Sequence, residues 1–243
     1  MLDLFSLSGK AIIVTGGARG LGLCIATALL EASCAHVFCC DVLSQPNTEE
    51  WAKAKQVAQR YGGEISYLQL DITNAEMVNE IFERIYEESV HEVYGLFAAA
   101  GIQQMTAALD YPPEDFRRIM DVNVTGKSCI RHSFSPWPTK RIIRSAFHRY
   151  LVYNPSGGET DAKTEDCWKY RHCREYVGND RQQGYVPVRR LEIAVSDGPP
   201  QGLTCLAYNT SKAALLQMCR SAAAEWGKFG IRVNVSRRQQ PEP

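Results

Sequence analysis

Tyr208 and Lys212 are the residues of this chain whose types and spacing could perform chemistry. They lie four positions apart, so on a helix the phenol and the ammonium face the same side, one turn apart. A phenol transfers protons poorly near neutral pH because its ordinary pKa is about 10. A fixed cation nearby stabilises the phenolate, which makes the pair a candidate proton-transfer device. Tyr-x-x-x-Lys alone is common on solvated helix faces, so its meaning depends on the elements that position it.

A glycine-rich turn near the N-terminus could hold a pyrophosphate. In the segment Thr15–Gly22, Gly16, Gly20 and Gly22 would let the backbone turn tightly and approach phosphates at the positive end of the next helix. The turn lies between a β-branched run at 11–14 and an apolar run at 23–30. This context strengthens a motif that is weak by itself.

Strand and helix patterns alternate over residues 1–129. We expect strands at 11–14, 36–40, 65–70 and 94–101, and a further strand at 231–235. Helices are expected at 23–30, from a capping box at Thr73 and Glu76 through Ile85, and from Pro113 towards Asn123. The alternation predicts an α/β fold with a Rossmann-type, doubly wound parallel sheet in a single domain over 1–243.

Asp41 follows the glycine turn by about 20 residues and ends the second expected strand. A carboxylate there can accept hydrogen bonds from an adenosine ribose and disfavours a 2′-phosphate. Arg19 favours the opposite choice of cofactor, because a guanidinium in the phosphate loop could bind NADP. The cofactor is therefore expected to be NAD or NADP, with NAD preferred.

Composition excludes several partner classes. Lysine plus arginine equals aspartate plus glutamate at 27 each, which gives no reason to expect a nucleic acid or membrane partner. The nine cysteines show no metal-type pairing, and Cys167, His172 and Cys173 lack a fourth ligand. Adjacent Cys39 and Cys40 fit opposite faces of a buried strand. We expect no metal and a reducing, cytoplasmic setting.

These motifs together resemble the short-chain dehydrogenase/reductase family. Thr15–Gly22 resembles its cofactor loop, Asp71 the acidic residue after its third strand, and 98–101 its Asn-Asn-Ala-Gly motif with the final Ala-Gly kept. Asn123 matches its relay asparagine, and Tyr208 with Lys212 its catalytic pair. The segments 97–104 and 203–208 are similar to fungal polyol and sorbose reductases of that family.

The resemblance implies a secondary alcohol or ketone, such as a polyol or sugar, as substrate. Tyr208 would exchange the proton, Lys212 would stabilise its phenolate and hold the nicotinamide ribose, and Asn123 would position a water. Besides Tyr208 and Lys212, it implies these cofactor contacts: Thr15, Gly16, Arg19, Gly20, Leu21, Gly22, Asp41, Asp71, Ile72, Ala100 and Gly101.

The family's substrate-polarising serine has no exact match. Val195 stands thirteen residues before the tyrosine, where the family has its serine, and Ser196 is one residue closer. Ser196 could serve if the intervening loop is one residue shorter, or it could be a turn serine ahead of Asp-Gly.

Residues 131–200 depart from the family pattern. From Asn123 to Tyr208 there are 85 positions, about twice the usual separation, and the tract is rich in arginine and aromatic residues without an apolar period. Possible elements are a short helix at 142–151 and an edge strand at 185–188. We interpret 131–200 as an irregular, aberrant insertion that replaces a helix and a strand.

The C-terminal sequence ends at Pro243 without the family's Pro-Gly turn, substrate-covering segment and seventh strand. A missing final strand and a reduced interface for the homo-oligomers usual in the family are therefore expected. Three interpretations remain: an active oxidoreductase, a nucleotide-binding relative without turnover, and a damaged gene product.

Overall fold

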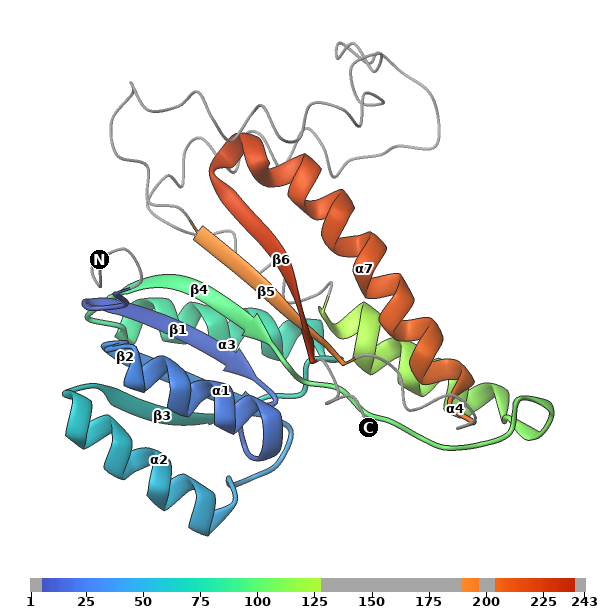
Figure 1. The fold of residues 1–243 in the computed structure, drawn as a ribbon, viewed down its shortest axis with the longest axis horizontal. Helices are drawn as coiled ribbons and strands as arrows, with labels where there is room; N and C mark the ends of the chain where they lie inside the picture. Colours follow the sequence, from blue (N-terminus) through green and yellow to red (C-terminus); the bar gives the residue numbers. More distant parts are fainter. Residues whose placement is uncertain (1–5, 128–188, 197–203, 239–243) are drawn as a thin grey trace. The chain divides into compact units, whose positions relative to one another are not determined.

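The computed structural model describes residues 6–127, 189–196 and 204–238. They form one six-stranded sheet in the order β3-β2-β1-β4-β5-β6, and every neighbouring pair is parallel (Figure 1). The strands are β1 (Lys10–Thr15), β2 (His36–Asp41), β3 (Glu64–Gln69), β4 (Glu92–Ala98), β5 (Arg189–Ser196) and β6 (Ile231–Arg238). The strand order reverses between β1 and β4, which is where ligands bind in doubly wound sheets.

Helices cover both faces of the sheet. The α-helices are α1 (Gly20–Glu31), α2 (Thr48–Tyr61), α3 (Ala75–Glu88), α4 (Pro113–Met120) and α7 (Leu206–Trp226). A π-helix, η3 (Asp121–Thr125), continues α4, and short 3-10 turns are η2 (Ala108–Asp110) and η5 (Gly227–Phe229). In Figure 1, α1 and α2 lie in front of the sheet and α3 lies behind it. The predicted doubly wound α/β fold is confirmed.

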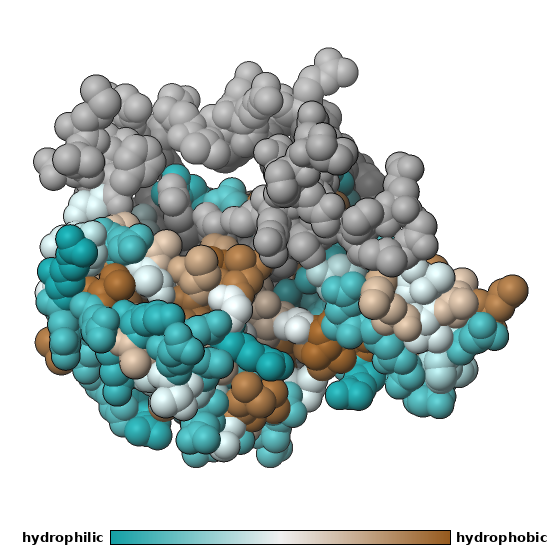
Figure 2. Space-filling view, turned by 60° about the horizontal axis from the view of Figure 1, so that its bottom comes forward, coloured by the Kyte–Doolittle hydropathy of each residue, from teal (hydrophilic) through white to brown (hydrophobic). Residues whose placement is uncertain are grey.

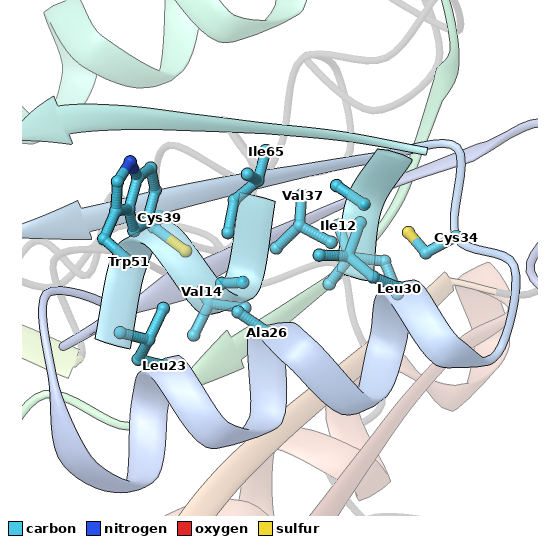
Figure 3. Packing of buried hydrophobic residues seen from close by; sticks show 12 residues of the cluster. Ile12, Val14, Leu23, Ala26, Leu30, Cys34, Val37, Cys39, Trp51 and Ile65 are labelled. Atoms are coloured by element: carbon cyan, nitrogen blue, oxygen red, sulfur yellow. The ribbon is translucent and has the colours of Figure 1, made fainter. Parts of the chain in front are cut away.

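The first core lies between the sheet and the pair α1 and α2. Alternate residues of β1 and β2, such as Ile12, Val14 and Val37, point into it and meet Leu23 and Leu30 of α1 (Figure 3). Cys39 belongs to this cluster, and its neighbour Cys40 is fully buried but lies outside it. This agrees with the prediction that the two thiols serve as small core side chains on opposite faces.

The helix α3 shows where the local pattern misleads. Its apolar residues Val78, Phe82 and Ile85 are buried as the spacing predicts. The predicted capping box at Thr73 and Glu76 is wrong, because Asn74 caps the helix through Met77 N–H. Thr73 instead lies in the turn before the helix, where its hydroxyl and its amide both donate to the Asp71 carboxylate.

The sequence pattern did not identify α2, although its end signals are strong. The Asn47 side chain accepts a hydrogen bond from Glu50 N–H, and Gly62 ends the helix with φ +72°. Its buried residues, Trp51, Ala54 and Ala58, recur at helical spacing, but small alanines make this stripe hard to see.

The strand β5 corrects the interpretation of residues 131–200. An irregular segment over the whole range is wrong for 189–196, because this stretch pairs with β4 and β6 inside the sheet. Extended backbone there satisfies the edge of β4 that would otherwise lack a partner. The helix suggested at 142–151, the strand suggested at 185–188 and the cysteines and histidine at 167–173 lie outside the described residues.

The described surface in Figure 2 is mainly polar, with apolar side chains in separate patches. The large apolar residues at the described surface are Leu21, Val42, Leu43, Tyr61, Val90, Met105, Leu109 and Leu206. Within the ranges that the structure describes, no helix has the length and the apolar composition needed to cross a membrane.

Candidate active site

The glycine turn closes against the end of β4. Gly16 has φ +73°, and a Cβ added there would lie 2.7 Å from the Cα and N atoms of Ala100. A Cβ on Gly22 would lie 2.0 Å from the Gly16 carbonyl oxygen. Thr15 connects the same two segments, because its carbonyl accepts from Ala99 N–H at 3.1 Å. Glycine at 16 and 22 is therefore required by the backbone geometry.

The N-terminus of α1 suits an anion. Arg19 at the N-cap makes no side-chain capping bond, and the first turn holds no acidic residue. The Glu50 carboxylate of α2 accepts instead from Gly20 N–H at 3.3 Å. A carboxylate at this position is an anion that occupies the kind of place a phosphate would take. The backbone cradle and the helix N-terminus thus fit a dinucleotide pyrophosphate, which would take the place of the Glu50 carboxylate, with Leu21 exposed beside them.

Asp41 lies at the end of β2, next to the glycine turn. Its two carboxylate oxygens accept from Ala18 N–H at 3.1 Å and from Leu43 N–H at 3.3 Å. Each oxygen keeps a further lone pair, so the carboxylate could still accept from a ribose. The geometry is compatible with the predicted ribose contact.

Asp71 and Ile72 follow β3 at the same edge of the sheet. Asp71 holds a local turn through Thr73, and its side chain is partly exposed. Ile72 is buried, and a Cβ on Gly126 would lie 3.0 Å from both its Cγ1 atom and its carbonyl oxygen. Gly126 thus lets the helix after η3 approach the end of β3.

Asn123 links the end of β4 to α7. It is fully buried, and its Oδ1 accepts from Ile102 N–H at 2.8 Å. Its Nδ2 donates to the Ile102 carbonyl at 3.0 Å and to Ser211 Oγ at 2.9 Å. The π-helical turn η3 that presents Asn123 is a feature often found at functional sites.

Gly101 gives Asn123 and Lys212 room to approach β4. A Cβ at Gly101 would lie 3.1 Å from Asn123 Oδ1 and 3.7 Å from Lys212 Nζ. The structure therefore brings together three of the residues predicted from the sequence, although they come from three separate elements.

Tyr208 and Lys212 form the expected pair on α7. Lys212 Nζ lies 4.9 Å from the centroid of the Tyr208 ring, and both residues are buried. Burial lowers the pKa of Lys212 to about 8, so the ammonium still predominates at neutral pH but gives up its proton more easily. Such an arrangement can move a proton between a phenol and the interior of the protein.

Ser196 is the last residue of β5, and its backbone is paired in register with Arg238. It thus lies at the carboxyl end of its strand, the same edge of the parallel sheet that holds the glycine turn and Asn123. Its proposed contact with substrate remains a prediction.

Sequence reasoning missed Ser211, Ile102 and Lys127. Ser211 is buried, donates to the Tyr208 carbonyl at 2.7 Å and accepts from Asn123. A small hydroxyl three residues after Tyr208 is a signal for such a bond within a helix. Ile102 contributes only backbone groups, which leave no signal in residue types. Lys127, one turn after Asn123, is buried although lysines are almost never fully buried.

Comparison with known proteins identifies related chains. The model of the family described as short chain dehydrogenase matches residues 10–137. A second model, described as Enoyl-(Acyl carrier protein) reductase, matches residues 198–236. The two matches lie on either side of 138–197, the larger part of the tract that departs from the expected pattern.

Individual relatives also have the names of dehydrogenases or reductases. A protein of Aspergillus versicolor named short chain dehydrogenases/reductase notP′ is 31% identical over 96% of this chain and 66% of its own length. D-arabinitol 2-dehydrogenase [ribulose-forming] of Candida tropicalis is 29% identical over 95% of this chain and 70% of its own. The RhlG/NADP active-site complex of Pseudomonas aeruginosa has a TM-score of 0.63 at 25% identity, with 97% of this chain and 73% of that chain covered.

Proposed function

The chain belongs to the short-chain dehydrogenase/reductase family, and we propose that it interconverts a secondary alcohol and a ketone with a nicotinamide dinucleotide. The observation on which this rests is the Lys212 ammonium over the Tyr208 ring, with Gly101 and the Asn123 network directly behind it. The bound cofactor would supply or accept the hydride.

The chain's own residues would hold and protonate the substrate. Tyr208 would exchange a proton with the substrate oxygen, and Lys212 would stabilise the phenolate and hold the nicotinamide ribose. Asn123 would position the relay, because its side chain ties Ile102 to Ser211 and so fixes α7 against the segment that follows β4. Ser196, at the end of β5, would polarise the substrate oxygen.

The glycine turn and its surroundings would hold the dinucleotide. Gly16, Gly20 and Gly22 would admit the pyrophosphate, and Thr15, Arg19 and Leu21 would flank it. Asp71, Ile72 and Ala100 would line the adenine side. The RhlG/NADP complex shows that a structural relative binds such a cofactor.

We favour NAD over NADP because the Asp41 carboxylate lies at the end of β2, beside the glycine turn. Asp41 accepts from Ala18 N–H and from Leu43 N–H. A 2′-phosphate near Asp41 would meet its negative charge, whereas a ribose hydroxyl could donate to it. Arg19 is the single cation in the loop that would oppose this preference.

We favour a polyol or sugar substrate. The segment after Gly101 presents amides: Gln104 donates to Asp115 at 2.7 Å and to Thr106 at 3.3 Å, and Gln103 is exposed. Backbone pairing of Thr106 with Cys205 holds this segment beside the start of α7. Polar groups next to Tyr208 suit a substrate with several hydroxyls, as does the likeness to an arabinitol dehydrogenase.

The test is a fluorescence titration of the purified chain with NADH and NADPH, followed by a screen of polyols and ketones. We expect saturable binding, tighter for NADH, and turnover of at least one polyol that falls about 1,000-fold in Tyr208→Phe. Tyr61→Phe, an exposed phenol on α2, is the matched control. Binding without turnover would favour the alternative of a nucleotide-binding relative, and the absence of binding to either cofactor would overturn the cofactor site.

A further inference from the structure

The segment that follows β2 is exposed and is held by hydrogen bonds from a neighbouring strand. Residues 42–45 are all exposed, so apolar packing contributes little to their placement. The Gln69 side chain of β3 donates to the Val42 carbonyl at 3.1 Å. The Tyr67 hydroxyl, from the same strand, donates to the Leu43 carbonyl at 2.6 Å. Two successive carbonyls of an exposed segment are therefore fixed by side chains of one strand.

Tyr67 and Gln69 lie on the face of the sheet that also bears the Asp41 side chain. In the parallel register of β2 and β3, Cys39 pairs with Tyr67 and Asp41 pairs with Gln69, and side chains alternate between the two faces. The Tyr67 ring meets the Trp51 ring of α2 edge to face, with 5.7 Å between the centroids, which restrains its hydroxyl. Burial first, and then the charge of Asp41, raises the pKa of Tyr67 to about 12, so the hydroxyl keeps its proton and remains a donor.

One peptide group joins the Gln69 contact to the Asp41 carboxylate. The carbonyl of Val42 and the N–H of Leu43 belong to the same planar trans peptide, so they point in opposite directions. The carbonyl accepts from Gln69, and the N–H donates to Asp41 Oδ1 at 3.3 Å. The other carboxylate oxygen accepts from Ala18 N–H of the glycine turn at 3.1 Å. Gln69 therefore orients the peptide that orients the carboxylate.

Hydrogen-bond satisfaction alone does not require these two contacts. Exposed carbonyls can be hydrated, so the carbonyls of Val42 and Leu43 would carry no burial cost without Gln69 and Tyr67. What the two side chains add is a fixed direction for the backbone that contacts Asp41. We name Tyr67 and Gln69 together the β3 clamp.

We propose that the β3 clamp positions Asp41 for dinucleotide selection, by holding the carboxylate in place for the ribose hydroxyls of NAD. This inference rests on the proposed function. A fixed carboxylate accepts from a ribose hydroxyl without a further loss of conformational freedom, whereas the 2′-phosphate of NADP is repelled by it. Loss of the clamp should therefore weaken NAD binding and leave NADP binding nearly unchanged.

The binding test measures the dissociation constants of NADH and NADPH by fluorescence for Tyr67→Phe and Gln69→Leu. Each change should weaken NADH binding about fivefold and NADPH binding by less than about twofold. Tyr61→Phe and Gln59→Leu, at exposed positions on α2, are the matched controls and should change neither constant. Equal weakening of both cofactors, or no change in either, would overturn the proposal.

A double variant separates positioning from a merely structural role. Asp41→Ala removes the carboxylate through which the β3 clamp acts. Adding Gln69→Leu to Asp41→Ala should therefore change the NADPH-to-NADH affinity ratio by less than about twofold, compared with about fivefold in the wild-type background. A structural role would give the same change in both backgrounds, and that result would count against the proposal.

A third readout needs no cofactor. In the free chain, hydrogen exchange at Leu43 N–H should be about fivefold faster in Gln69→Leu, because its peptide is no longer held. Leu70 N–H, which donates to the Asp41 carbonyl at 2.7 Å, should exchange as in the wild type. Unchanged exchange at Leu43 would overturn the clamp even if NADH binds. Should the wild type bind neither dinucleotide, the proposed function fails, and this exchange measurement alone decides whether the β3 clamp holds the segment.

Discussion

The region around β1, β2, α1 and α2 and the region between η3 and α7 bury different kinds of side chain. The first fills its core with residues such as Ile12, Val14 and Leu30. The positions in it whose residue type is fixed by the backbone are glycines. The second buries Asn123, Lys127, Ser211 and Lys212, which are four of the six buried polar or charged residues in the described part of the chain. Apolar burial stabilises the fold without directional requirements, whereas each buried polar group needs a partner or a function.

The two regions therefore have different roles in the proposed site. The glycine turn forms a cradle from backbone atoms, which is possible only because Gly16 and Gly22 have no side chains. The η3–α7 region depends on which side chains are present and on their proton affinity. We therefore expect the buried charges of the second region to lower the free energy of unfolding. Replacing a buried lysine there by an apolar residue should raise it.

The largest effect should come from Lys127→Met, measured by urea unfolding at several pH values. Burial lowers the pKa of Lys127 to about 7 in the folded chain, so between about pH 7 and 10.5 the unfolded chain binds a proton that the folded chain lacks. The wild type should gain stability as pH rises through that window, and the cost of burial is greatest below pH 7. We expect Lys127→Met to be more stable by about 4 kcal/mol at pH 6 and only slightly so at pH 10.5.

Lys55→Met should change the free energy of unfolding by no more than about 0.5 kcal/mol at any pH, since its side chain is exposed. An equal gain for Lys127→Met at pH 6 and 10.5 would show that its ionisation is not the cause, and the contrast between the two regions would lose its electrostatic basis.

Gly16→Ala tests the backbone cradle of the first region. The new Cβ would meet Ala100 atoms at 2.7 Å and would require φ +73°. We expect a loss of stability of about 3 to 4 kcal/mol and no measurable dinucleotide binding. Gly62→Ala is the matched control, because it has φ +72° and no atom within 4 Å, and should cost only about 1 to 2 kcal/mol. Similar losses in both variants would mean that close approach to β4 is unimportant.

Asn123 of the second region can be compared with Asn74, a helix cap that lies outside both regions. Asn123→Ala removes the bonds to Ile102 and Ser211 and leaves Ile102 N–H without its acceptor. It should cost about 2 to 3 kcal/mol in urea unfolding and should lower turnover. Asn74→Ala removes only the cap of α3 and should cost about 1 kcal/mol with turnover unchanged. If the cap were the costlier of the two, the buried network would be of little consequence.

Asp41→Asn should have the smallest effect. The amide oxygen can still accept from Ala18 N–H, but the negative charge near the ribose is gone. The ratio of NADPH to NADH affinity should rise about tenfold, or about 1.4 kcal/mol, in the fluorescence titration. Glu49→Gln, an exposed carboxylate paired with Lys53 on α2, should leave the ratio unchanged. An unaltered ratio in Asp41→Asn would remove the argument for NAD.

Much of the fold followed from local patterns. The apolar runs predicted β1, β2, β3, β4 and β6 within a few residues, because short β-branched and apolar runs are a local signal of a strand. The same window failed at α2, whose buried stripe includes Ala54 and Ala58, and at β5, which lies after a tract without an apolar period. The capping-box pattern placed the start of α3 one residue early, because Thr73 and Asn74 are both good N-cap residues and only the structure shows that Asn74 accepts from Met77 N–H.

The site residues likewise fall into those that local sequence patterns predicted and those that only the tertiary structure revealed. Residue types and spacing alone were enough to single out Tyr208, Lys212 and the glycine turn, because helix geometry and backbone freedom act over a few residues. The bonds of Asn123 to Ile102 and Ser211 span 21 and 88 positions. The burial of Lys127 likewise depends on α7, far along the chain. Only the tertiary structure decides such contacts, because desolvation and proton affinity are set by neighbours that folding brings together.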